Sequence, residues 1–167
     1  CMGIADARMY ENGYVYGTVP GDPDLPTIGL IAHMDTAPDA SGENVNPILH
    51  ENYDGRDVTL PATGMVMKVS TFPFLKDLKG ETLITTDGTT LLGADDKAGV
   101  AEIMALVARI AQDPSLPHPA LGICFCPDEE IGHGAELLDI ESFGCKYAYT
   151  VDGGPVGELE WECFNAA

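Results

Sequence analysis

Four apolar segments of this sequence are each followed directly by acidic residues or by a histidine–aspartate pair. In chain order, the groups that follow them are His33-Met34-Asp35, Asp95-Asp96, Asp128-Glu129-Glu130 and Asp152-Gly153-Gly154. In open α/β sheets, ligands bind beyond the carboxyl ends of parallel strands, so side chains that follow different strands meet at one edge. We therefore expect all four groups to lie on one rim of a sheet.

The residue types in these groups suit a cation site. Several carboxylates brought together repel one another and shift their pKa values upward, and a bound cation removes that penalty. Histidine, aspartate and glutamate without thiolates suit zinc, manganese or cobalt. The number of acids also suits two ions that share one bridging carboxylate.

Each group has a simpler explanation when it is considered alone. His33 could be a hydrogen-bonded structural residue, and Asp95-Asp96 could cap a helix. Glu129-Glu130 could be a solvated turn, and Asp152-Gly153-Gly154 is ordinary turn chemistry. These explanations weaken together because all four groups occupy the same kind of position. Competing motifs are absent from the sequence, namely a GxxxxGK[ST] phosphate loop, an HExxH helix, a GxSxG elbow and a calcium-binding loop.

The elements that must position these groups can be located from apolar patterns. Continuous apolar runs predict buried strands over Thr27 to Ala32, Ala120 to Cys126 and Tyr147 to Val151. Apolar residues at helical spacing predict a helix from Lys97 to Gln112, which Asp113-Pro114 ends. This order of strands and helices is typical of an α/β protein with a mixed, mostly parallel sheet flanked by helices.

Other segments carry weaker signals. Alternation over Arg8 to Val19 predicts strand structure with a turn at Asn12-Gly13. From about Ala37 to Gly80 the pattern weakens, and we expect long loops decorated with small elements. The remaining expectations are short strands near Thr63 to Val69 and Thr82 to Thr85, a short helix over Ala135 to Ile140, and a strand with one wet face over Gly157 to Phe164.

Composition bounds the class of protein. The 167 residues favour a single domain with one substantial core. The formal net charge of −19, from 27 acidic and 8 basic residues, disfavours binding to nucleic acid or to anionic membranes. No apolar run reaches the roughly 18 residues that a membrane helix needs. Among five cysteines there is no CxxC pair, and Cys124 and Cys126 are expected to be reduced and buried, which suits the cytoplasm.

At the four groups, the sequence resembles the M20 family of metallopeptidases. His33-Met34-Asp35-Thr36 is similar to the HxD segment of that family, and Gly93-Ala94-Asp95-Asp96-Lys97 to its bridging-aspartate segment. Asp128-Glu129-Glu130-Ile131-Gly132 is similar to its paired-glutamate segment, and Asp152-Gly153-Gly154 to its third ligand segment. The run from Gly157 to Ala167 resembles the tripeptide-cleaving members in particular. Four motifs in the right order are far more specific than any one of them.

The resemblance implies a role for each matched residue. His33 and Asp152 would hold one zinc ion, Asp95 would bridge two ions, and Glu130 would hold the second. Glu129 would be the general base that takes a proton from the water bridging the two zinc ions. Asp35 would hydrogen-bond His33, fixing its tautomer. The peptide bond from Asp95 to Asp96 is expected to be cis.

The resemblance also implies an activity, a cofactor and a domain plan. The expected reaction is hydrolysis of the amino-terminal residue from a short peptide substrate, a tripeptide, with two zinc ions per subunit. Residues 1–167 would then form an incomplete zinc-exopeptidase-like catalytic domain, without the lid domain through which relatives could form homodimers and without a later histidine ligand. On this basis we expect the chain as given to bind the second metal poorly and to be inactive alone.

Three alternatives stay open at this point. The first is another M20 enzyme, such as a dipeptidase or an amino-acid deacylase, with the same metal site and a different pocket. The second is a non-catalytic metal-binding module, against which the presence of both Glu129 and Asp95 argues. The third is a plain structural α/β domain whose carboxylates are only surface charge.

Overall fold

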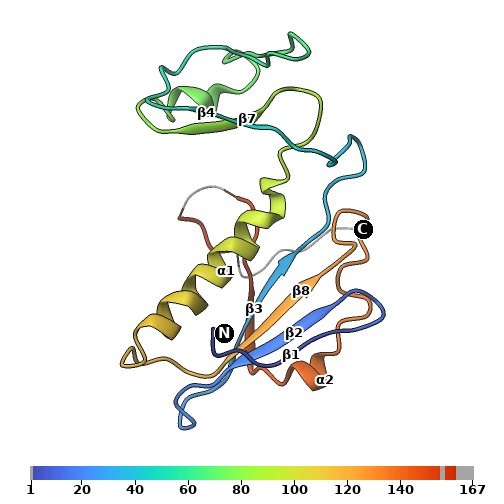
Figure 1. Cartoon of the computed structure of the whole chain (residues 1–167), viewed down its shortest axis with the longest axis vertical. Helices are drawn as coiled ribbons and strands as arrows, with labels where there is room; N and C mark the ends of the chain where they lie inside the picture. The colour runs from blue at the N-terminus through green and yellow to red at the C-terminus, as the bar shows by residue number, and fades with distance from the viewer. Residues whose placement is uncertain (1, 155–156, 161–167) are drawn as a thin grey trace.

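The computed structural model describes residues 2–154 and 157–160, and its main element is a five-stranded mixed sheet (Figure 1). Its strands are, in spatial order, β1 (Ala5–Met9), β2 (Val15–Val19), β8 (Leu121–Cys126), β3 (Ile28–His33) and β9 (Tyr147–Thr150). β3 pairs parallel with both β8 and β9, whereas β2 pairs antiparallel with β1 and β8. The predicted mixed sheet is confirmed, and so is the turn at Gly13, whose φ is +87°.

The long helix α1 (Ala94–Gln112) packs on one face of this sheet, as Figure 1 shows. Its buried side chains Ile103, Val107 and Ile110 recur at helical spacing. They form one core with residues of the strands, Val19, Ala32, Leu121 and Ile123. The predicted helix over Lys97 to Gln112 is therefore confirmed, because its apolar stripe has the sheet to cover it.

The other face of the sheet carries a second apolar cluster. Cys124 and Cys126 are free and buried there, beside Tyr14 and Tyr16. Burial raises the pKa of Cys124 to about 12 and that of Cys126 to about 11. The expectation that both thiols behave as small buried hydrophobes is borne out.

Beyond the carboxyl end of β3 lies a separate group of short elements, here called the lobe (residues 47–86), at the top of Figure 1. It contains β4 (Pro47–His50), β5 (Val58–Thr59), β6 (Val66–Met67), the 3-10 helix η1 (Pro73–Lys76) and β7 (Leu83–Thr86). β4 pairs with β7 and β5 with β6, both antiparallel. The lobe has its own core of Tyr53, Val58, Leu60 and Leu75. The short strands predicted near β6 and β7 are present, whereas β4 and β5 went unpredicted because two to four residues carry little periodicity.

Three local predictions differed from the structure. The strand predicted over Tyr147 to Val151 is present as β9, but it lies at the edge of the sheet and all four of its residues are exposed, so the predicted burial is wrong. The helix expected over Ala135 to Ile140 is wrong: that stretch forms turns, and α2 (Ile140–Phe143) begins where it should end. The Asp139 side chain explains this start, since it accepts a hydrogen bond from the Ser142 N–H and so caps α2. The strand expected over Gly157 to Phe164 falls partly outside the described residues, and residues 157–160 are not in a strand.

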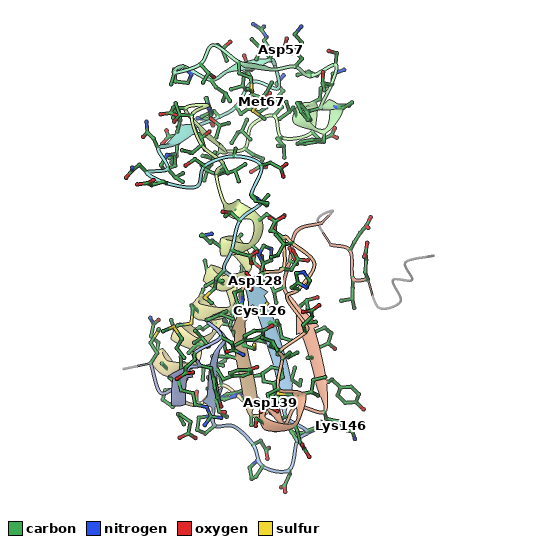
Figure 2. All side chains as sticks on the ribbon, turned by 90° about the vertical axis from the view of Figure 1, so that its right-hand side faces the viewer. Asp57, Met67, Cys126, Asp128, Asp139 and Lys146 are labelled. Carbon is green, nitrogen blue, oxygen red and sulfur yellow. The ribbon has the colours of Figure 1, made fainter. Side chains whose placement is uncertain are left out.

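Figure 2 shows which end of the sheet carries the predicted groups. Asp128 lies at the end that faces the lobe, and Lys146, just before β9, lies at the opposite end. The carboxyl ends of β3, β8 and β9 therefore share one edge. Within the described part of the chain, no helix combines the length and apolar character that crossing a membrane would need.

Candidate metal centre

His33 is the centre of the cluster that the strand ends bring together. It closes β3, and its side chain is only 2% exposed. Its Nε2 lies 2.9 Å from Asp95 Oδ1, 3.8 Å from Glu129 Oε2 and 4.0 Å from Asp152 Oδ1. Three carboxylates from separate parts of the chain thus surround a single imidazole nitrogen. One ligand atom each of His33, Asp95 and Asp152 can be chosen so that all lie within 4.8 Å of one another, which makes these residues a possible metal-binding triad.

Asp35 contacts both His33 and the loop that carries the two glutamates. Its Oδ1 lies 3.2 Å from His33 Nδ1, on the side of the ring opposite Asp95. The same carboxylate accepts hydrogen bonds from the Glu129 N–H at 3.2 Å and the Glu130 N–H at 3.1 Å. Burial opposes the charge of Asp35, but these N–H donors outweigh it and lower the pKa of Asp35. Asp35 therefore stays ionised and ties β3 to the loop that carries both glutamates.

Asp95 and Asp96 divide two functions between them. The peptide bond joining them is cis, as the resemblance implied. Asp95 is exposed and faces His33, whereas Asp96 is 2% exposed and faces the interior. Asp96 accepts the backbone N–H of His33 at 3.1 Å and that of Gly99, also at 3.1 Å. The helix-cap explanation of the pair holds for Asp96, and the cluster position belongs to Asp95.

Asp96 is the site residue that sequence reasoning missed. Its bond to Gly99 is the N-cap bond of the regular part of α1, because the φ and ψ angles of Asp95 and Asp96 are not helical. Its second bond fixes the backbone of His33, 63 residues away in the sequence. The sequence suggested the cap, but no local pattern signals the bond to His33. A side chain at Gly99 would collide with the Val151 carbonyl oxygen, so this glycine lets α1 approach the end of β9.

Glu130 lies apart from the His33 contacts. Glu129 is half-exposed and turns its carboxylate toward His33, whereas Glu130 lines an adjoining cavity together with Asp95. Asp95 thus has His33 on one side and shares a cavity with Glu130 on the other. The structure brings His33, Asp35, Asp95, Glu129 and Asp152 into one cluster and places Glu130 next to it.

Comparison with known proteins shows which sequences this chain resembles. The chain is 57% identical to peptidase T of Desulfitobacterium hafniense over 99% of its own length, and 54% identical to peptidase T of Bacillus pumilus, also over 99%. The chain is a homologue of peptidase T. It spans about 41% of the length of these relatives. No protein-family model matches the chain.

Solved structures agree with this assignment. The aminopeptidase PepT of Bacillus cereus superposes with a TM-score of 0.65 at 26% identity, covering 91% of this chain and 34% of that protein. A tripeptidase from Staphylococcus aureus gives a TM-score of 0.64 at 25% identity, with the same shares covered. The resemblance predicted from the four motifs is confirmed, and the fold is that of the corresponding part of these two solved structures.

The donor set of this peptidase T homologue fits a bound cation. Burial opposes a charged imidazole at His33, but Asp95, Asp152 and Asp35 outweigh it and raise the pKa of His33. Burial also raises the pKa of Asp96, with Asp152 contributing in the same direction. This pattern reflects an excess of negative charge around one nitrogen, which a divalent cation would neutralise. Imidazole with carboxylates is a common ligand set for zinc.

The three other histidines lie elsewhere. His50 Nε2 is 3.0 Å from Thr85 Oγ1 in the lobe, His118 Nδ1 is 2.8 Å from the Pro119 carbonyl oxygen, and His133 Nδ1 is 2.7 Å from Glu136 Oε1. Each of these rings has a local partner, and within the described residues His33 is the histidine of the cluster. The peptidase T homologue therefore offers one imidazole to this centre.

Proposed function

We propose that this chain forms part of the active site of a metal-dependent aminopeptidase that hydrolyses the amino-terminal residue from tripeptides. The observation that carries the proposal is the convergence of His33, Asp95 and Asp152 within 4.8 Å at the carboxyl edge of the sheet. The similarity to peptidase T and to a solved tripeptidase supports the reaction and the substrate class.

The ligand roles that we propose are those implied by the family resemblance, and the positions of the donors support them. His33 and Asp152 would hold one zinc ion and Glu130 a second, with Asp95 between them. The position of Asp95 supports a bridging role, since it lies 2.9 Å from His33 Nε2 and shares a cavity with Glu130. When bound, two zinc ions lower the pKa of water toward neutrality and polarise a peptide carbonyl.

Glu129 is our candidate for the general base. Its Oε2 lies 3.8 Å from His33 Nε2, which places it at the cluster, and its side chain is half-exposed and so open to water and substrate. A carboxylate in this position can accept a proton from the attacking water and pass it to the leaving amine. The hydrogen bond from its N–H to Asp35 holds its backbone in place.

Changing Glu129→Gln tests this proposal in the full-length gene product. We expect kcat for a tripeptide to fall by about 1,000-fold, because the amide cannot accept the proton. Bound zinc, measured by atomic emission after dialysis, should stay unchanged. The matched control is Glu136→Gln, an exposed glutamate that pairs with His133, which should leave both quantities as they were.

Two results would contradict the proposal. Full tripeptidase activity in Glu129→Gln would remove the general base from the mechanism. A wild-type protein that binds no zinc, and whose activity survives a chelator, would remove the metal centre altogether. Loss of zinc together with loss of activity in Glu129→Gln would instead assign Glu129 to the ligands.

A reducing cytoplasm is the compartment that we propose for this protein. The free thiols of Cys124 and Cys126 lie buried in the core without a disulfide, which suits such a compartment. Fractionation of cells expressing the tagged protein tests this, and recovery in a secreted or envelope fraction would contradict it.

A further inference from the structure

Both glutamates of the proposed metal centre lie on a long connection, here called the glutamate loop (residues 127–139), which runs from the end of β8 to the start of α2. Figure 2 shows its course: Asp128 lies at the end of the sheet that faces the lobe, and Asp139 lies toward the opposite end. Most side chains of the loop are exposed, including the apolar Ile131 and Leu137. A loop that buries so little of its own surface depends on hydrogen bonds from its surroundings to keep one conformation.

Tyr14 ties the middle of the glutamate loop to the sheet. It directly precedes β2, its side chain is 2% exposed, and its hydroxyl donates a hydrogen bond to the Gly134 carbonyl oxygen at 3.0 Å. The ring stacks on Tyr16, with 6.3 Å between the ring centroids, and belongs to the same buried cluster as Cys124 and Cys126. Because a buried phenol hydroxyl needs a hydrogen-bond partner, the Gly134 carbonyl is anchored to the core of the sheet.

Gly134 connects this anchor to the proposed general base. The loop folds back on itself here, so that a Cβ built on Gly134 would lie only 2.9 Å from Glu129 Cα and 3.1 Å from Glu129 Cβ. The turn between them is closed by a hydrogen bond from the Gly132 N–H to the Glu129 carbonyl oxygen at 2.8 Å. A second bond, from the His133 N–H to the Asp128 carbonyl oxygen at 2.9 Å, tightens the same turn. A shift of the Gly134 backbone would therefore move Glu129.

We propose that Tyr14 is a positioning residue for the reaction, whose hydroxyl acts through Gly134 to hold the Glu129 carboxylate at the metal centre. The inference rests on the proposed function, since it concerns the same general base. Asp35 holds the Glu129 N–H directly, and Tyr14 adds a second support from a segment 120 residues away from Gly134 in the sequence. A general base acts only within hydrogen-bond reach of the proton that it takes, so a small displacement of its loop lowers kcat.

Tyr14→Phe in the full-length protein tests the inference, because it removes the hydroxyl and keeps the ring. We expect kcat for a tripeptide to fall by about tenfold or more, with KM within about twofold of the wild-type value. Bound zinc should stay unchanged, since His33, Asp95 and Asp152 come from other segments of the chain.

The matched control is Tyr16→Phe. Tyr16 is also buried, at 9% exposed, and stacks on Tyr14, but its hydroxyl accepts the Asp139 N–H at 3.1 Å, at the far end of the glutamate loop. That end has a further anchor in Leu138, which packs against the same cluster. Loss of the Tyr16 hydroxyl should therefore lower kcat by less than about twofold. An equal fall in kcat for Tyr14→Phe and Tyr16→Phe would overturn the inference, as would an unchanged kcat in Tyr14→Phe.

A double variant separates positioning from general destabilisation. If Tyr14 acts through Glu129, Tyr14→Phe should lower kcat in the wild-type background and have no further effect in Glu129→Gln, because the carboxylate that it positions is already gone. A purely structural role would lower kcat by the same factor in both backgrounds, and that result would overturn the inference. Gly134→Ala is a second variant: its methyl group would press on Glu129, so kcat should fall while KM is retained.

Failure of the proposed function gives a different pattern. If the wild-type protein hydrolyses no tripeptide, or if Glu129→Gln keeps full activity, the proposed function fails. Hydrogen exchange read by mass spectrometry then decides the contact by itself. Faster exchange over residues 128–134 in Tyr14→Phe, but not in Tyr16→Phe, supports the role of Tyr14 in holding the loop. Unchanged exchange over these residues in Tyr14→Phe overturns it.

Discussion

The sheet and the lobe bury their apolar side chains in different ways. In the sheet, strands of four to six residues pair with one another, and one face shares a core with α1. In the lobe, two strands are only two residues long, and a small core gathers around Leu75, whose side chain is 0% exposed. The parallel strands of the sheet have their carboxyl ends side by side, so they bring together side chains that are distant in the sequence. The short strands of the lobe do this less.

This difference decides where the chemistry lies. Every residue of the proposed metal centre ends or follows a strand of the sheet, or lies in the first turn of α1. The lobe contributes His50 and several acids, yet His50 has Thr85 as its partner and lies outside the cluster. The connections to the lobe contribute instead to the cavity wall, through Thr36 and Leu91. The sheet and the start of α1 therefore supply the groups of the proposed metal centre, and the connections to the lobe line the cavity beside them.

The largest expected effect contrasts two histidines, one in each region. His33→Ala should weaken zinc binding by about 100-fold or more, because it removes the buried imidazole that we propose as a ligand and that three carboxylates surround. His50→Ala should leave zinc affinity unchanged, since that ring bonds to Thr85 within the lobe. Zinc titration with a competing chelator measures both. Equal affinities in the two variants would break the assignment of the metal centre to the sheet.

Removing one core side chain from the sheet should destabilise the sheet alone, and removing one from the lobe should destabilise the lobe alone. Leu75→Ala in the lobe and Ile103→Ala in α1 should each cost about 3 kcal/mol in the free energy of unfolding of the region concerned, from lost burial and a residual cavity. Hydrogen exchange read by mass spectrometry should show faster exchange over residues 47–86 for Leu75→Ala, with β3 and β8 still protected. Ile103→Ala should instead speed hydrogen exchange in β3 and β8, because Ile103 belongs to the core that these strands share with α1. Uniform loss of protection in both variants would show that the two cores unfold as one.

Two aspartates that bind backbone N–H groups offer a finer comparison. Asp96→Asn should lower the free energy of unfolding by about 2 kcal/mol. The two carboxylate oxygens of Asp96 accept the N–H groups of His33 and Gly99, whereas the amide of asparagine has one oxygen and would face the other N–H with its NH₂ group. Asp57→Asn in the lobe should cost less than about 0.5 kcal/mol, since Asp57 is exposed and accepts a single hydrogen bond among the described residues, from the Val69 N–H. Urea unfolding measures the two values, and a larger loss for Asp57 than for Asp96 would reverse the comparison.

The smallest expected effect concerns the two buried cysteines of the sheet, which should not react with an alkylating reagent. Cys124 and Cys126 should resist alkylation by iodoacetamide at pH 8, because burial holds their pKa values at about 12 and about 11 and leaves almost no thiolate. Peptide mapping of the native protein should recover both unmodified, whereas protein unfolded in urea should be fully alkylated. Rapid native labelling of Cys124 would show that the face opposite α1 opens readily.

Elements with strong periodicity were predictable, and elements held by single contacts were not. The apolar stripe of α1 and the apolar runs of β3 and β8 could be recognised, because each is long enough for its pattern to exceed chance. The apolar run of β9 predicted the strand but not its environment, since all four of its residues are exposed. The helix predicted over Ala135 to Ile140 failed, because the Asp139 cap starts α2 later. β4 and β5 carry too few residues to show alternation, and their pairing depends on partners up to 39 residues away, such as Thr86 for Pro47.

The sequence by itself determined that carboxylates and a histidine lie at the ends of apolar segments, since residue order and apolar runs are local properties of the chain. From that order alone, convergence of His33, Asp95 and Asp152 could be expected. Only the tertiary structure decided that Asp96 turns inward to hold the His33 backbone, that Asp35 also holds the glutamate loop, and that Glu130 faces a cavity instead of His33. These features depend on side-chain direction and on contacts between segments as many as 95 residues apart, which local patterns do not encode.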